Sequence, residues 1–452
     1  MDIKELFEQI TALLEKNDYQ SLRTIFLENE PFDLALICEE LDEKTRPFFF
    51  RLMPRGIAAE CFSHLSVDVQ ESLLKHLTDT ELRAMLDELF IDDTVDLIEE
   101  LPANVAARIL ENSDAESREQ INQILHYPKD SAGSIMTVEY VRLGRNMSIA
   151  DAFARIRRVG MEKETIYTCY VTDSDRTLVG VVTAMDLLLN ETDTLVSEIM
   201  ETNVISVTTH EHRDSVVQKF SHYDFLAIPV VDDENRLMGI VTVDDAIDVA
   251  VESATEDVEI MAGITPTDKP YLKVGVFETW WSRIPWLMLL MLSATFTGAI
   301  ISSFESALSK VAVLTSFIPM LMGTAGNAGG QTSVTIIRAL SLGDVEPSDV
   351  LKILWKELRV SFLCGVSLAA VGFVKALFVD GAGSAWVALA VSVTLAATVI
   401  AAKTVGCCFP LLIKKLGFDP AVVANPFITT VVDALALLVY FAVATSLIPA
   451  LQ

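Results

Sequence analysis

The chain has 452 residues, too many for one compact core, and carries 34 basic against 63 acidic side chains, a net charge of −29. Two or three domains are therefore expected. So negative a charge excludes nucleic acid as a partner, because phosphate binding needs clustered Lys and Arg, and it favours a protein that attracts cations.

The charge is unevenly distributed along the chain. Residues 271–452 hold 11 basic and 9 acidic side chains, whereas residues 1–270 hold 23 basic and 54 acidic ones. One half is therefore polar and polyanionic, and the other is apolar and nearly uncharged. No His lies beyond residue 222 and no two Cys show CxxC spacing, so a zinc site or a disulfide framework is not expected.

The N-terminal part is predicted to be helical. Residues 1–16 read as a charged amphipathic helix and not as a cleavable signal. From 39 to 122 the sequence has a twelve-residue period: the third position is Leu or Met until Ser113, and the twelfth is Phe, Leu or Ile until Asn122. Each block is expected to form a short helix and a turn that bury their apolar faces against their neighbours, in a solenoid with a polar cap.

A second repeat, with a period of 59 residues, follows the helices. Residues 169–187 align with 228–246, so that Gly180 matches Gly239 and Asp186 matches Asp245. Each copy predicts two strands joined by an acidic turn, then a helix that begins near an Asp. Two such β–β–α units in tandem resemble a pair of CBS domains, which often bind adenine nucleotides.

Residues 244–264 are predicted to form a long acidic helix between the soluble half and a membrane. Five apolar stretches follow, each long enough to cross about 30 Å of hydrocarbon. They are 283–303, 311–340, 353–379, 385–413 and 421–448. Basic residues gather after the second and fourth stretches, so the N-terminal half is expected in the cytoplasm and the C-terminus outside, in a multi-pass protein of the cell (inner or plasma) membrane.

Asp433, in the middle of the fifth stretch, is the main candidate for chemistry. A carboxylate at that depth is costly unless it faces a pathway or the protein interior, and it is expected to be the single buried carboxylate of the membrane half. Mg²⁺ keeps several waters and binds one or two carboxylates, so one Asp433 from each subunit of a two-fold dimer suits a hydrated ion. A protonated or hydrogen-bonded structural Asp is the alternative.

The second apolar stretch is rich in small and neutral polar residues. Its glycines permit a close approach of another helix or a break, its proline frees a carbonyl, and its polar side chains offer oxygens. Simple helix packing through small residues is the alternative. The residues are Pro319, Gly323, Gly326, Asn327, Gly329, Gly330, Gln331 and Thr332, with Asn425 and Pro426 in the same roles in the fifth stretch.

These residues carry a resemblance that covers nearly the whole chain. The sequences PMLMGTAGNAGGQTSVTIIRAL, RIPWL, DPAVVANPFITTVVDALALLVYF and YPKDSAGSIMT closely resemble the MgtE family of Mg²⁺ channels. The resemblance implies a homodimer in the lipid bilayer, with a pore between the two membrane domains that is formed by Asp433, Asn327, Asn425 and Gln331. It also implies a gate that cytoplasmic Mg²⁺ holds closed.

The ion sensor implied by this resemblance consists of acidic side chains that repel one another until cations neutralise them. Two pairs of them, Asp92 with Asp96 and Asp245 with Asp248, are spaced to share a helix face. A solvated surface carboxylate is the alternative at every position. The implied positions are Asp92, Asp96, Asp214, Asp224, Asp245, Asp248, Glu252, Glu256 and Asp257.

The sequence departs from the family pattern at three positions. His212 and Ser253 stand where the family commonly has acids, so fewer or weaker regulatory ions are expected. Met185 precedes Asp186, where nucleotide-binding members tend to have Arg. Asp186 could still bond a ribose hydroxyl, but phosphate contact loses a cation, and ATP binding is left open.

The sequence thus predicts a multidomain membrane protein that imports Mg²⁺ and is not an enzyme, since it has no Walker loop, nucleophile elbow or kinase motif. Two alternatives remain open: a Mg²⁺ exchanger coupled to Na⁺ or H⁺, which a single buried carboxylate disfavours, and a membrane-anchored Mg²⁺ or nucleotide sensor. The predicted parts are an all-α superhelical domain at 1–127, tandem α/β CBS domains at 128–243, a connecting helix at 244–270 and a five-helix α transmembrane domain at 271–452.

Overall fold

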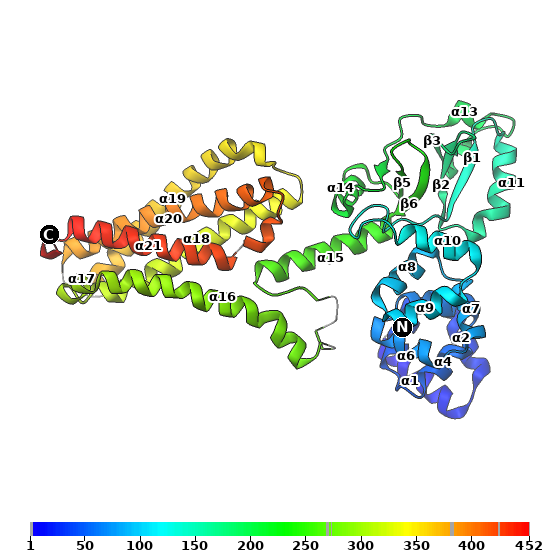
Figure 1. Ribbon diagram of the computed structural model, residues 1–452, viewed down its shortest axis with the longest axis horizontal. Helices are drawn as coiled ribbons and strands as arrows, with labels where there is room; N and C mark the ends of the chain where they lie inside the picture. The colour runs from blue at the N-terminus through cyan, green and yellow to red at the C-terminus, as the bar shows by residue number, and fades with distance from the viewer. Residues whose placement is uncertain (1–2, 268–270, 273, 380–383, 424, 452) are drawn as a thin grey trace. The chain divides into compact units, whose positions relative to one another are not determined.

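The computed structural model describes residues 3–267, 271–272, 274–379, 384–423 and 425–451, without the side chains of 423 and 425. The chain divides into two units, Met1–Val249 and Ala250–Gln452. Figure 1 labels the helices and strands of both.

The first unit begins with a stack of short helices, blue to cyan in Figure 1. From α6 onwards each helix starts twelve residues after the one before it, which confirms the predicted repeat. The first block differs, because α4 has only seven residues and starts six residues after α3 ends. The helices are α1 (Ile3–Lys16), α2 (Tyr19–Glu28), α3 (Pro31–Glu40), α4 (Arg46–Leu52), α5 (Arg55–Ser63), α6 (Val67–His76), α7 (Asp79–Leu86), α8 (Ile91–Glu100), α9 (Ala103–Asn112) and α10 (Ala115–Ile124).

Alternate helices of this stack pack on one another: α3 contacts α5, α5 contacts α7, and α7 contacts α9. The Leu and Met residues at the third position of each block are buried, as the solenoid requires. Arginines tie the repeats together, since the Arg108 guanidinium donates to the carbonyl oxygens of Leu74 and Leu77 at 2.6 and 2.7 Å. The predicted polar cap is confirmed at Asn122, which is exposed, and is wrong at Ser113, which is buried.

Two small three-stranded sheets follow, and their strands repeat with the predicted period. In each sheet the first two strands are parallel and the last two antiparallel. The sheets are β1 (Tyr140–Gly144), β2 (Thr165–Thr172) and β3 (Leu178–Thr183), then β4 (Val207–Thr208), β5 (Ala227–Val231) and β6 (Leu237–Thr242). The helices around them are α11 (Ile149–Val159), η1 (Gly160–Glu162), α12 (Ala184–Leu189), α13 (Val196–Ile199) and α14 (Arg213–Tyr223).

The long connecting helix, α15 (Val243–Met261), is shorter than the predicted connecting segment. It ends because Gly263 adopts a left-handed φ of 72° and Ile264 N–H donates to the carbonyl of Glu259 at 2.9 Å. This is the usual glycine termination of an α-helix. Residues 268–270 of the predicted segment lie outside the described residues.

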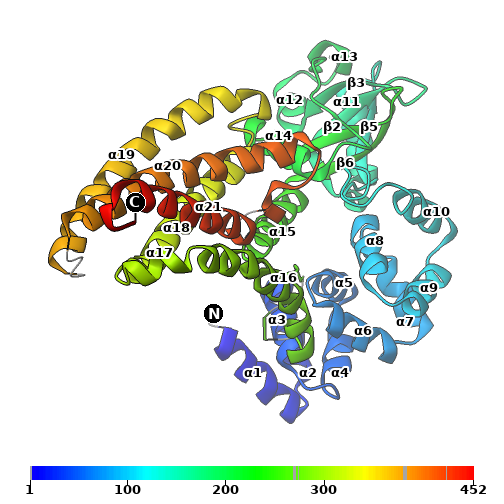
Figure 2. The same ribbon diagram turned by 60° about the vertical axis from the view of Figure 1, so that its left-hand side comes forward.

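The second unit is a bundle of long helices, seen from two sides in Figures 1 and 2. Helices α18, α20 and α21 pack on one another, α19 packs on α20, and α16 packs on α21. No residue of α16 is fully buried. The elements are α16 (Val276–Ser303), α17 (Glu305–Lys310), α18 (Leu314–Ser341), η2 (Pro347–Asp349), α19 (Val350–Phe378), α20 (Ala385–Lys415), η3 (Pro420–Val423), α21 (Asn425–Leu447) and η4 (Pro449–Leu451).

Each of the five predicted apolar stretches therefore corresponds to one long helix. Among the described residues, four of these helices are long and apolar enough to cross a membrane: α16, α19 (from Pro347), α20 and α21. Helix α18 is also long enough, but its Gly, Thr, Asn and Gln residues make it less apolar. That α18 spans the membrane remains a prediction.

Candidate functional site

Asp433 lies in α21 where this helix meets α18. A Cβ placed on Gly326 of α18 would be 3.7 Å from Asp433 Oδ1 and 3.1 Å from Thr429 Cγ2. The glycine therefore leaves room for Thr429, and Asp433 Oδ1 lies at an ordinary contact distance from the same position. Asp433 Oδ1 is buried and accepts no hydrogen bond within the described part of the chain. A buried oxygen without a partner is costly, so this position suits a ligand more than a structural role.

Helix α18 is continuous through its glycines, so they do not break the helix. Gly326 and Gly329 serve close approach, whereas a Cβ on Gly323 would meet no atom within 4 Å. Along α18, Asn327, Gln331 and Thr335 are exposed at a spacing of four residues. Residues four apart share one face of a helix, so these side chains form a polar stripe. In hydrocarbon such a stripe requires water or another polypeptide beside it.

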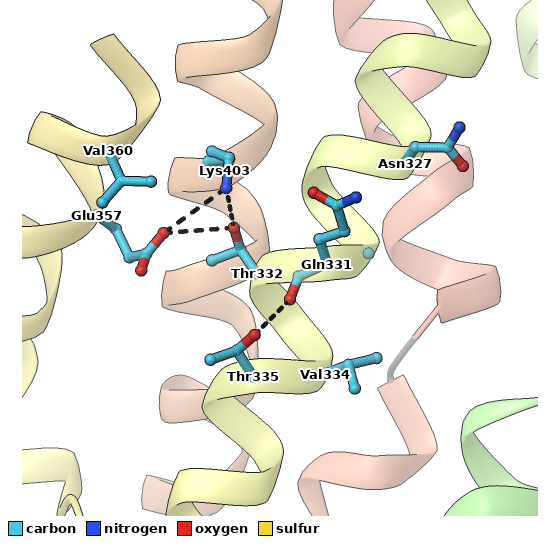
Figure 3. Close-up of a pocket in the computed structure, with 9 residues that line it drawn as sticks. Asn327, Gln331, Thr332, Val334, Thr335, Glu357, Val360 and Lys403 are labelled. Carbon is cyan, nitrogen blue, oxygen red and sulfur yellow. Dashed lines mark hydrogen bonds and ion pairs between the residues drawn. The ribbon is translucent and has the colours of Figure 1, made fainter. Parts of the chain in front are cut away.

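Asn327 and Gln331 line an open pocket of about 760 Å³, together with Thr332, Thr335 and Val334. Figure 3 shows this pocket, whose opposite wall is formed by side chains of α19 and α20. Asp433 is not among the residues that line it. The structure thus brings two of the predicted pore residues together and leaves Asp433 at a separate contact of α18. The side chain of Asn425 lies outside the described residues.

The pocket contains two charged residues that the sequence analysis missed. Glu357 of α19 and Lys403 of α20 have only 13% and 9% of their side chains exposed, and Lys403 Nζ lies 4.0 Å from Glu357 Oε2. The prediction of a single buried carboxylate in the membrane half is therefore wrong. Lys403 stands alone in a long apolar stretch, which is a signal in the sequence. Its pairing with Glu357 depends on how α19 and α20 pack.

A second group of carboxylates lies in the first unit, around the start of α8. Burial raises the pKa of Asp93 to about 6, and the negative charge of Asp245 adds to the shift. The pKa of Asp96 is raised as well. Burial also holds the pKa of Asp92 well above its ordinary value, again with Asp245 adding to it. The predicted neighbours Asp92, Asp96 and Asp245 are thus brought together, and Asp96 remains solvent-accessible.

Four members of this group were not predicted. Glu164, beside β2, has one buried carboxylate oxygen without a partner among the described residues, and burial followed by the charge of Asp244 raises its pKa to about 7. Glu139 accepts a hydrogen bond from Ile91 N at 3.0 Å, at the start of α8. Their nearness depends on how the helical stack packs on the sheets. We call the whole set the acidic cluster: Asp92, Asp93, Asp96, Glu139, Glu164, Asp244 and Asp245.

The other predicted sensor residues are more dispersed. Asp214 and Asp224 lie at opposite ends of α14, roughly 15 Å apart along the helix. Asp248 adds its charge to that of Asp245. The last three, Glu252, Glu256 and Asp257, lie on the later part of α15, where Asp257 accepts a hydrogen bond from Ser341 Oγ of α18 at 3.3 Å.

Asp186, the predicted nucleotide contact, serves as a helix cap. Its Oδ2 accepts hydrogen bonds from Thr183 N at 2.9 Å and from Thr183 Oγ1 at 2.6 Å, at the start of α12. Asp245 accepts from Thr242 Oγ1 at 2.6 Å in the second copy of the repeat. Capping of the following helix therefore explains why both copies of the repeat have an Asp at this position.

The acidic cluster fits a hydrated divalent cation better than a tightly coordinated one. Within the described residues, no three His, Cys, Asp or Glu side chains are close enough to hold a metal directly. Mg²⁺ keeps most of its waters and needs one or two carboxylates, so water can bridge the remaining distance. The unpartnered oxygen of Glu164 and the mutual repulsion of the carboxylates supply the negative charge that such an ion neutralises.

Known proteins match the chain from end to end. The profile of a family described as divalent cation transporter, MgtE, covers residues 318–443, and that of the MgtE intracellular N domain covers 29–130. CBS domain profiles cover 132–191 and 196–252. A magnesium transporter MgtE of Thermus thermophilus is 36% identical over 450 residues, 99% of each chain. The chain belongs to the MgtE family.

Other MgtE relatives agree with this assignment. The magnesium transporter MgtE of Bacillus subtilis is 33% identical over 459 residues, which cover 100% of this chain and 99% of the relative. A crystal structure of the soluble part of a magnesium transporter matches with a TM-score of 0.53 at 32% identity, over 56% of this chain and 100% of that one. The cytosolic domain of the Mg²⁺ channel MgtE in complex with ATP matches with a TM-score of 0.51 at 36% identity, over 53% and 98%.

Proposed function

We propose that the protein is a homodimeric Mg²⁺ channel whose pore runs beside α18 and α21 and which closes when cytoplasmic Mg²⁺ binds the acidic cluster. The observation that carries the proposal is the buried, unpartnered oxygen of Asp433 against Gly326. A carboxylate oxygen in an apolar helix that has no hydrogen-bond partner among the described residues is available to a passing cation. Mg²⁺ suits such a site, because it keeps most of its water ligands and needs few oxygens from the protein.

Two features support a dimer in which the pore lies between the subunits. The polar stripe of Asn327, Gln331 and Thr335 needs a wet or protein-covered surface, which a second copy facing the first would provide. A single Asp433 per chain becomes a pair across a two-fold axis. These residues, with Asn425, are the proposed pore ligands.

We propose that the N-terminal half is cytoplasmic and that the C-terminus is outside. Basic residues lie close to the end of α18 and the start of α19, such as Arg338 and Lys352, and α20 ends in Lys414 and Lys415. Cytoplasmic ends of membrane helices carry this excess of Lys and Arg. The C-terminal segment after α21 carries no charged side chain.

The proposed gate uses α15 as the link between sensor and pore. The first residues of this helix carry Asp244 and Asp245 of the acidic cluster. Its last residues, Ile260 and Met261, pack with Ile337 of α18. Cations that neutralise the cluster stabilise the compact arrangement of its helices, and α15 passes this preference to the end of α18. The remaining proposed sensor residues are Asp214, Asp224, Asp248, Glu252, Glu256 and Asp257.

Patch-clamp recording of the whole protein in liposomes tests this function. Wild-type current is expected to fall as Mg²⁺ on the cytoplasmic side rises, and Asp433→Asn, which keeps the size of the side chain, is expected to abolish it. The double variant Asp245→Asn/Asp248→Asn is expected to conduct but to close less with Mg²⁺. Current that Asp433→Asn leaves unchanged would refute the proposed pore, and unchanged closure in the double variant would refute the sensor.

The same recordings separate the channel from its two alternatives. A Mg²⁺ exchanger requires Na⁺ or H⁺ on the opposite side, so a current in a pure Mg²⁺ gradient excludes it. A membrane-anchored sensor has Mg²⁺-dependent protease protection of the first unit but no current. Binding of ATP is a further proposal, based on the ATP complex of a relative's cytosolic domain. It is tested by calorimetric titration of ATP into the whole wild-type protein and into Asp186→Asn. The Asn side chain keeps one oxygen that can cap α12.

A further inference from the structure

The pocket beside α18 has a charged wall that the proposed pore does not use. Glu357 and Lys403, which we call the charge pair, both line this pocket, as do Asn327, Gln331 and Thr335. The two charges come from different helices, and neither belongs to the contact between Asp433 and Gly326. Ionisable groups buried among the membrane helices of a protein are rare and usually have a function.

Thr332 of α18 joins the two charged groups. Lys403 Nζ donates to Thr332 Oγ1 at 3.2 Å, and the same hydroxyl donates to Glu357 Oε2 at 3.4 Å. Figure 3 shows the resulting triangle, with one residue from each of α18, α19 and α20. A hydroxyl has one proton to donate and lone pairs to accept, so both hydrogen bonds are possible at once. The carboxylate is therefore neutralised by the ammonium within the same small network.

Lys403 is held at this position by its own helix. A Cβ placed on Gly329 of α18 would be 3.3 Å from the carbonyl oxygen of Ala402, the residue before Lys403. One turn later, a Cβ on Gly406 would overlap the carbonyl oxygen of Gly329. Helices α18 and α20 thus meet backbone to backbone on both sides of Lys403. The backbone of Lys403 is therefore held close to α18, and its ammonium lies beside Glu357 and Thr332 at the wall of the pocket.

We propose that Lys403 is a tethered counter-ion that keeps a second divalent cation out of this pocket, and thereby determines how weakly the channel holds its ion. Glu357 together with Asn327, Gln331 and Thr335 is a set of oxygen donors of the kind that Mg²⁺ prefers. Conduction requires that no site on the route binds the ion too tightly. The charge pair supplies no net charge to the pocket, so Asp433 remains the dominant anionic group. This inference rests on the proposed function.

Uptake of Mg²⁺ by liposomes that contain the whole protein tests the inference. Lys403→Met leaves the carboxylate without its partner, so the KM for Mg²⁺ is expected to fall at least tenfold, with a lower maximal rate. Glu357→Gln leaves the ammonium without its partner and is expected to raise the KM at least tenfold, because a unit charge within several ångströms strongly affects a divalent ion. The double variant Glu357→Gln/Lys403→Met carries no charge and is expected to keep a KM close to that of the wild type.

Lys415→Met is the matched control, because Lys415 is an exposed residue at the end of the same helix and does not line the pocket. Its KM is expected to stay unchanged. A purely structural pair would shift both single variants in the same direction, and that result, or two unchanged KM values, would overturn the inference. If the single variants do not reconstitute, the neutral double variant decides: a wild-type KM supports the inference and a lost or shifted activity overturns it. Absence of uptake by the wild type would instead refute the proposed function.

Discussion

Asp93 offers a quantitative test of the repulsion within the acidic cluster. Burial and the charge of Asp245 raise its pKa from 3.8 to about 6. Since the folded-state pKa lies above the unfolded value, the stability associated with Asp93 is fully present below about pH 4 and is lost as the pH rises through about 6. Above that pH the ionised carboxylate costs the folded state about 3 kcal/mol. Asp93→Asn is therefore expected to stabilise α8 by up to this amount at pH 7.5 without Mg²⁺.

Hydrogen–deuterium exchange of the whole protein in detergent measures this change, because amide protection reports the free energy of local opening. A gain of about 3 kcal/mol corresponds to a protection factor of α8 amides that is roughly 100-fold higher. Added Mg²⁺ is expected to protect α8 strongly in the wild type and much less in Asp93→Asn, since the variant has less repulsion to neutralise.

Asp33→Asn is the matched control for this experiment. Asp33 is the third residue of α3, as Asp93 is of α8, so both substitutions remove an acid from the first turn of a helix. Loss of the favourable interaction with the helix dipole costs about 0.3–1 kcal/mol. Asp33→Asn is therefore expected to lower protection slightly. Equal or lower protection of α8 in Asp93→Asn, without Mg²⁺, would refute the argument from repulsion.

Three further predictions concern the acidic cluster, the packing of helices inside the second unit and the hydrogen bonds inside the helical stack. Mg²⁺ is expected to protect the first unit from protease several-fold less well at pH 6.0 than at pH 7.5, because protons bind the acidic cluster in its place; equal protection at both pH values would contradict this. Gly406→Ala is expected to lower the Tm of the membrane domain by several degrees, through overlap with the carbonyl of Gly329, whereas Gly298→Ala meets no atom within 4 Å and should not. Arg108→Met is expected to destabilise the helical stack by about 1–3 kcal/mol in urea unfolding, because it leaves two helix-end carbonyls unpaired.

Periodicity was sufficient to predict most of the fold. The twelve-residue period placed the helix starts from Arg55 to Ala115, and the 59-residue period placed β3 and β6, because both patterns record local geometry. The end of a helix was harder to predict. The end of α15 depends on a left-handed Gly263, which the preceding apolar pattern does not reveal.

The candidate sites were predictable only in part, because the missing members are neighbours in space and not in sequence. Asp433 could be found from its isolation in an apolar helix. Glu164 and Glu139 joined the cluster only through the packing of α8 on the sheets. Lys403 could be noticed as the one charged residue of the apolar stretch 385–413, but its partner could not. Its nearness to Glu357 follows from the contact of α19 with α20, which no single-sequence pattern encodes.

The alternation of contacts in the helical stack has a consequence for how this region can change in length. Because α3, α5, α7 and α9 pack in one row, removal of one twelve-residue block would transfer every earlier helix to the other row. Removal of two blocks, 24 residues, would leave each remaining helix in its own row and α8 still facing the sheets. Length variants of this domain are therefore expected to be tolerated in steps of two helices, because only such steps keep every remaining helix packed in its own row.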